Sequence, residues 1–147
     1  MSDRFPLRPD ETWHAEMRAR YGDAVPALEH MRFRRGLQTL VADFFEQFHD
    51  REYQRLVAVH SIVTRNAGFV VLDARGHFGL PYGEYGAVDA LLSTTQERLS
   101  EACEHCGAVG EIVAKTGLEA LLDDPDAALG DRLLCNECYE KWRHRDD

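Results

Sequence analysis

The sequence predicts an α+β fold, with an N-terminal helical part, a small antiparallel sheet and a C-terminal cysteine-rich module. Three observations support this prediction. Apolar residues recur at helical spacing between Leu37 and Phe48. The run Phe69-Val-Val-Leu72 is typical of a strand. The chain's 4 cysteines form two C-x-x-C pairs, and both pairs lie in its last third.

The paired cysteines predict a metal site. Two cysteines separated by two residues can turn both sulfurs toward one point, and two such pairs supply a tetrahedron of soft ligands. We therefore expect one structural zinc ion per chain. Its expected ligands are Cys103, Cys106, Cys135 and Cys138. Gly107 follows the first pair and allows the backbone to curl at positive φ. The second pair begins a predicted helix, whose N-terminus favours the negative charge of thiolates.

A C-x-x-C-G knuckle, a strand pair and a helix that carries the second pair together resemble a treble-clef zinc finger. The matching positions are Cys103, Cys106, Gly107, Cys135 and Cys138. The segments 103–110 and 133–138 also resemble those of small uncharacterised bacterial and phage proteins, which place a strand and a helix before the same finger. The resemblance covers the last third of the chain and implies a structural zinc ion. The insert between the two pairs is longer than is usual for this finger.

Two other interpretations of the cysteines are open. Two disulfides would need an oxidising compartment, and no feature of the sequence indicates secretion. A redox C-x-x-C motif is expected after a strand in a βαβ unit. Here a helical pattern precedes Cys103, and the redox interpretation leaves the second pair unexplained. The zinc interpretation accounts for both pairs.

Helical patterns dominate the N-terminal part. Asp10 is the expected N-cap of a first helix that ends at Gly22. A second short helix is expected from Pro26 to about Gly36, and the helical pattern resumes from Tyr53 to Val63. A last helix, from Tyr85 to Ala102, leads to the first cysteine pair.

These patterns divide the chain into two expected domains. Residues 1–102 are expected to form a mainly helical domain with a β-hairpin near 69–83, and residues 103–147 the four-cysteine zinc-binding module. Glycines recur across 76–86, but no Gly-Lys-Ser/Thr follows them, so a phosphate-binding loop is not predicted. Between the cysteine pairs, we expect strands at 111–115 and 132–134 and a helical turn at 118–122.

Charge and hydropathy restrict the partners. The formal net charge is −9, and residues 101–147 hold twelve acidic and five basic residues, a balance of −7. Phosphate backbones repel such a surface, so we do not expect nucleic acid as a partner. An acidic surface fits a basic protein partner better. The first residues lack the apolar region of a signal peptide, and no apolar run approaches a membrane span. We therefore expect a cytoplasmic protein without a membrane partner.

The sequence thus predicts a zinc-stabilised protein-interaction or regulatory protein, of the inhibitor or immunity type, from a bacterium or phage. The alternative is a nucleic-acid-binding regulator that uses the zinc module with Arg32, Arg34 and Arg35. Those arginines are also explained as cations at a helix C-terminus. We do not expect an enzyme, because four thiolates leave no position for an activated water. His14-Ala-Glu16 matches part of a zinc-deaminase signature, but no proline precedes either cysteine pair.

Overall fold

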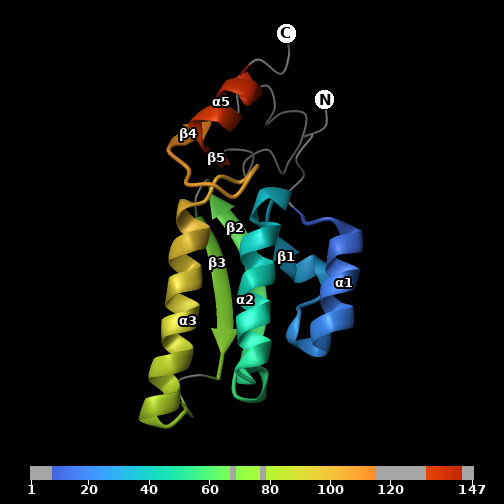
Figure 1. Cartoon of the computed structure of the whole chain (residues 1–147), viewed down its shortest axis with the longest axis vertical. Coiled ribbons are helices and arrows are strands. Elements are labelled where there is room, and N and C mark those ends of the chain that lie inside the picture. Colours follow the sequence, from blue (N-terminus) through green and yellow to red (C-terminus); the bar gives the residue numbers. More distant parts are fainter. Residues whose placement is uncertain (1–7, 67–68, 77–78, 115–131, 144–147) are drawn as a thin grey trace.

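The computed structural model describes residues 8–66, 69–76, 79–114 and 132–143. Figure 1 shows α2 and α3 side by side along a sheet, with α1 beyond α2 and the cysteine module at one end. The helices are α1 (Glu11–Tyr21), α2 (Gln38–Asp50), α3 (Tyr82–Glu101) and α5 (Asn136–Arg143). The strands are β1 (Met31–Arg32), β2 (Ala58–Asn66), β3 (Phe69–Arg75), β4 (Ile112–Ala114) and β5 (Arg132–Leu134). This mixture of helices and small sheets agrees with the predicted class.

Helix α1 begins and ends where the sequence indicates. The Asp10 carboxylate accepts hydrogen bonds from the backbone N–H groups of Thr12 and Trp13, at 2.9 and 3.2 Å. Gly22 ends the helix with a φ of +63°, which a residue with a Cβ rarely adopts. The predicted N-cap and C-terminal glycine are therefore both confirmed.

The core lies between α1, α2, α3 and one face of the sheet. Helix α2 contributes Phe44, Phe45 and Phe48, none of which is more than 1% exposed. These aromatic rings contact one another at centroid distances of 5.1 to 5.3 Å. Helix α3 buries the residues that its spacing predicts, which are Val88, Leu91, Leu92, Thr95 and Leu99. Both helices thus use their apolar faces as expected.

Strand β2 replaces an expected helix. Residues 53–63 show helical spacing in the sequence, but β2 is extended and pairs antiparallel with β3. The register shifts between Val59 and Ser61, which marks a bulge at His60. The buried side chains change from Val59 on one side of this bulge to Ile62 on the other. This spacing of three imitates a helix, although the β-branched residues favour a strand.

The predicted hairpin near 69–83 is wrong in its second strand. Its first strand is β3, but the partner of β3 is β2, and α3 already begins at Tyr82. The expected short helix from Pro26 to Gly36 is also wrong. That segment contains two short 3₁₀ helices, η2 (Leu28–His30) and η3 (Arg35–Leu37), with strand β1 between them. Strand β1 pairs parallel with β2, so the three-stranded sheet is mixed rather than antiparallel.

The outer edge of β3 is bonded to a side chain of α3. The Gln96 amide oxygen accepts a hydrogen bond from the Leu72 N–H at 2.9 Å, and its NH₂ group donates to the Val70 carbonyl. Gln96 therefore makes the bonds that a neighbouring strand would make. This contact holds α3 beside the sheet, and α3 in turn leads to Cys103.

The glycine-rich segment does not form a binding loop in the described residues. Gly76 turns the chain after β3 with a φ of +103°. Gly83 and Gly86 lie inside α3, where a Cβ at either position would meet open space. The expected helical turn at 118–122 lies outside the described residues. Within the described residues, every helix is too short or too polar to cross a bilayer.

Candidate metal centre

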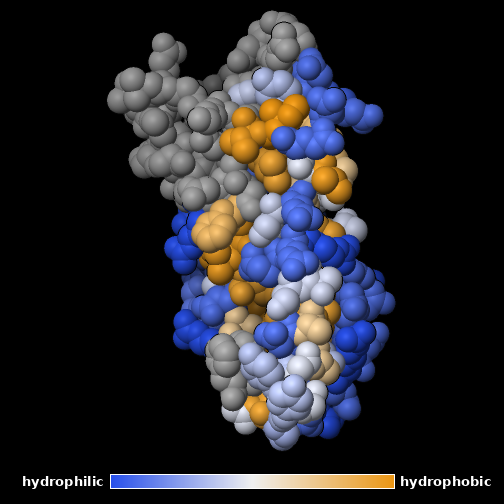
Figure 2. Space-filling view, turned by 90° about the vertical axis from the view of Figure 1, so that its left-hand side faces the viewer, coloured by the Kyte–Doolittle hydropathy of each residue, from blue (hydrophilic) through white to orange (hydrophobic). Residues whose placement is uncertain are grey.

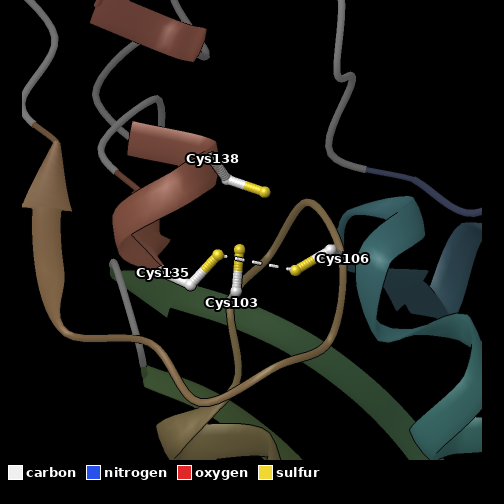
Figure 3. A group of neighbouring side chains, drawn as sticks. All are labelled: Cys103, Cys106, Cys135 and Cys138. Atoms are coloured by element: carbon white, nitrogen blue, oxygen red, sulfur yellow. Dashed lines mark hydrogen bonds between the residues drawn. The ribbon is translucent and has the colours of Figure 1, made fainter. Parts of the chain in front are cut away.

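The first cysteine pair lies on a tight turn directly after α3. The Gly107 N–H donates to the Cys103 carbonyl at 2.8 Å, and the Cys103 N–H donates to the Ala108 carbonyl. Gly107 has a φ of +84°, as its position after the second cysteine predicts. This knuckle turns the Cys103 and Cys106 side chains toward the same space (Figure 3).

The second pair lies at the beginning of α5. The Tyr139 N–H donates to the Cys135 carbonyl at 2.9 Å, so Cys135 occupies the N-cap position. Strand β5 ends at Leu134 and delivers Cys135 to this position. Strands β4 and β5 pair antiparallel, with Ile112 opposite Leu134, and connect the knuckle to the helix. The strand pair and the helix that carries the second pair are therefore both present.

The four sulfurs fit one tetrahedral metal ion. All four Sγ atoms lie within 4.8 Å of one another. The Sγ atoms of Cys106 and Cys135 are 3.7 Å apart (Figure 3). A tetrahedron with metal–sulfur bonds of about 2.3 Å requires sulfur–sulfur distances of about 3.8 Å. All four cysteines are free in the structure.

The electrostatics of the cluster favour a cation. The backbone N–H of Cys138, at the start of α5, lowers the pKa of Cys135. Burial, together with the neighbouring thiols, raises the pKa of Cys138 well above its usual range. Four thiolates this close repel one another, so they ionise together only when a positive ion lies between them.

The cluster is open on one side. Cys103 is fully buried, Cys135 and Cys138 are partly buried, and Cys106 is exposed. The stacked rings of Tyr139 and Trp142, with centroids 6.2 Å apart, lie on the same helix and pack against this small apolar group. The centre is therefore enclosed by the first cysteine and the helix, and reaches solvent at Cys106.

A buried carboxylate lies inside the knuckle, and sequence reasoning missed it. The Glu104 side chain is 0% exposed and forms an ion pair with Arg34, whose side chain is 1% exposed, at 3.2 Å. Burial raises the pKa of Glu104, while the Arg34 guanidinium and the Leu133 N–H act in the opposite direction. A glutamate between two ligands has no sequence signal for burial, because its partner is 70 residues away.

Two glycines allow the knuckle to lie against η3. A Cβ on Gly36 would overlap the Glu104 carbonyl group, and a Cβ on Gly107 would lie 2.8 Å from the Gly36 carbonyl oxygen. The Gly36 N–H donates to the Glu104 carbonyl at 3.1 Å. These contacts cross the expected boundary at 102/103, and the division into two domains stays a prediction.

The structure does not gather the basic residues Arg32, Arg34 and Arg35 on one surface. Arg34 points inward to Glu104, and Arg35 forms a half-exposed ion pair with Asp10 at 3.9 Å. Arg32 lies in β1, two residues after the 3₁₀ helix η2 ends at His30. His14, from the deaminase-like tripeptide, is buried and its Nε2 lies 2.8 Å from the Pro26 carbonyl oxygen. That imidazole lies in α1 and contributes to the fold of the N-terminal part.

No protein-family model matches the chain, and neither a curated protein nor a solved structure matches it. The four-cysteine cluster itself is therefore the basis for any functional conclusion.

Proposed function

We propose that this chain is a zinc-stabilised protein-interaction or regulatory protein, of the inhibitor or immunity type, that holds one structural Zn²⁺. The observation that carries the proposal is the convergence of four Sγ atoms within 4.8 Å. Thiolate sulfur in a tetrahedron is the ligand set that structural zinc prefers, and four protein ligands leave no open coordination position. The proposed role is therefore binding rather than catalysis. The order of knuckle, strand pair and helix supports a treble-clef-like module.

The surface of the module supports a protein partner. Val109 is 70% exposed and Val113 is 48% exposed. Figure 2 shows apolar side chains gathered on the upper part of the face that carries β4 in Figure 1. The same third of the chain has a charge balance of −7. An apolar surface on an acidic module fits a partner that presents an apolar patch with basic residues around it.

The nucleic-acid alternative is weaker, because Arg34 is buried and paired. The segment 32–35 then lacks the three adjacent cations that phosphate contacts would use. We expect weak, non-specific binding at physiological salt. A gel-shift series on random and defined sequences, at increasing salt, tests this expectation. Tight binding of one defined sequence, on the order of nanomolar, would favour the alternative.

Metal content is the first test of the proposal. Protein purified without added metal should contain about one zinc per chain by elemental analysis. Cobalt substitution should give the visible absorption of a tetrahedral thiolate site. A zinc content near zero, together with four reactive thiols, would overturn the proposal.

Partner capture is the second test. The full chain with its metal, immobilised and exposed to a host extract, should retain one basic protein at stoichiometric amounts. The double variant Val109→Asp/Val113→Asp should lose this protein while keeping its zinc. Tyr82→Asp is the matched control, because Tyr82 is 94% exposed but lies at the first turn of α3. Equal capture by both variants would show that the partner binds elsewhere.

A further inference from the structure

Glu104 contacts two segments that are distant from it in the chain. Its Oε1 accepts from Arg34 at 3.2 Å, and its Oε2 accepts from the Leu133 N–H at 2.7 Å. Its backbone N–H donates to the Leu133 carbonyl at 2.9 Å. Its own carbonyl accepts from the Gly36 N–H at 3.1 Å. One residue therefore connects the first ligand pair, the strand before the second pair, and the N-terminal core.

The position of Glu104 matters for the metal because of its neighbours in the sequence. Glu104 follows the ligand Cys103 directly, and Leu133 lies two residues before the ligand Cys135. The two hydrogen bonds between Glu104 and Leu133 on β5 thus set the separation of the two ligand pairs, and the bond to Gly36 fixes the knuckle against η3. Groups that orient ligands in this way strengthen metal binding without touching the ion.

The pair with Arg34 extends this effect into the N-terminal core. Both side chains are buried, and a buried charge that loses its partner is strongly unfavourable. Arg34 precedes η3, and its carbonyl accepts from the Leu37 N–H at 3.0 Å, next to the start of α2. When the knuckle loses its order, Arg34 loses the carboxylate that neutralises it. Metal binding and the order of this segment are then linked, and linkage acts in both directions.

The geometry points to Glu104 as a positioning residue of the metal centre, which couples metal occupancy to the segment Met31–Leu37 through Arg34. This inference rests on the metal binding in the proposed function. It adds a specific residue and a specific route to that function. We expect the N-terminal apolar core to keep its own packing, so that the coupling acts at the contact between the two parts.

The zinc dissociation constant, measured by competition with a chromogenic chelator, tests the positioning role. Glu104→Gln keeps the size of the side chain and still accepts from the Leu133 N–H. We expect it to bind zinc about 10- to 100-fold more weakly. The control is Glu137→Gln, which removes the same charge beside Cys138 from an exposed position. It should change affinity less than about threefold.

A double-mutant cycle tests the pairing. Arg34→Met alone should also weaken zinc binding, because it removes the ion-pair partner of the buried Glu104. The double variant Arg34→Met/Glu104→Gln should bind zinc about tenfold more tightly than the summed effects of the two single variants predict. If Glu104→Gln does not fold, Arg34→Met decides the question, since it leaves the knuckle sequence intact.

Hydrogen exchange tests the coupling directly. Chelation of wild-type protein should speed exchange across 31–37, while the part of α2 from 41 to 48 stays protected. Zinc affinity of Glu104→Gln equal to wild type, or identical exchange of 31–37 with and without zinc, would overturn this inference alone. Absence of zinc from the wild-type protein would overturn the proposed function as well.

Discussion

The N-terminal part and the cysteine module are held together by different means. The N-terminal part buries one apolar cluster to which α1, α2, α3 and the sheet all contribute. In the described residues of the module, the buried cluster consists of Cys103 and Leu134, with four partly buried neighbours. We expect this apolar burial to stabilise the N-terminal part by itself, whereas a unit as small as the module seldom folds on packing alone. We expect its stability to come from a bound metal and from its contact with η3.

Loss of one cysteine ligand should have the largest effect, and it should affect the module far more than the N-terminal part. Cys135→Ser removes a thiolate, and in small modules zinc binding is itself folding free energy. We expect loss of the metal and loss of hydrogen-exchange protection after about residue 100, with protection kept across 37–63. Chelation of the wild-type protein, followed by zinc addition, is the reversible control. Uniform loss across both parts would show one cooperative unit and contradict the division at 102/103.

A core substitution should give the opposite pattern. Phe44 is 1% exposed and packs against Phe45 and Phe48, so Phe44→Ala should destabilise the N-terminal part by about 3–5 kcal/mol. Denaturant unfolding followed by far-ultraviolet circular dichroism measures this loss. Below the transition, zinc content should stay at one per chain. Loss of zinc while α2 is still folded would contradict the separate roles.

A substitution at the contact should affect both parts. Gly36→Ala would place a Cβ against the Glu104 carbonyl group with no room for it, so the knuckle must shift. We expect a loss of about 1–3 kcal/mol in stability, together with weaker zinc binding. The control is Gly79→Ala, where a Cβ has no neighbour within 4 Å. Equal stability and equal zinc affinity for the two variants would show that the contact carries little energy.

The smallest expected effect is a gain in stability. Gly86→Ala adds a methyl group inside α3, where a Cβ meets open space. Alanine loses less backbone entropy than glycine in a helix, so the N-terminal part should gain about 0.5–1 kcal/mol. The midpoint of denaturant unfolding measures this gain, and the zinc affinity should not change. A loss of stability would indicate that the glycine contacts a partner or another segment.

Local sequence patterns predicted the elements that depend on local physics. The spacing of Cys103, Cys106, Cys135 and Cys138 determines which sulfurs can meet, so the cluster followed from the sequence. Helix α1 followed from the cap at Asp10 and its terminal glycine. Strand β2 did not, because the bulge at His60 puts one step of three, from Val59 to Ile62, into the alternation of buried side chains.

The buried ion pair was beyond sequence reasoning for a different reason. Arg34 stands among other basic residues, and Glu104 is one of twelve acidic residues in an acidic third of the chain. Composition predicts that both side chains are solvated. Only the tertiary contact between η3 and the knuckle brings them together, 70 residues apart in the chain. The support of the metal centre is thus less predictable from sequence than its ligands.

The amide of Gln96 has a consequence for self-association. An unprotected strand at the edge of a sheet is a template on which other chains can polymerise into extended β-structure. Here the Val70 carbonyl and the Leu72 N–H, which such a chain would need, are already bonded to Gln96. An incoming strand must first break both bonds and displace α3. One glutamine therefore gives the β3 edge of this small sheet a barrier to aggregation.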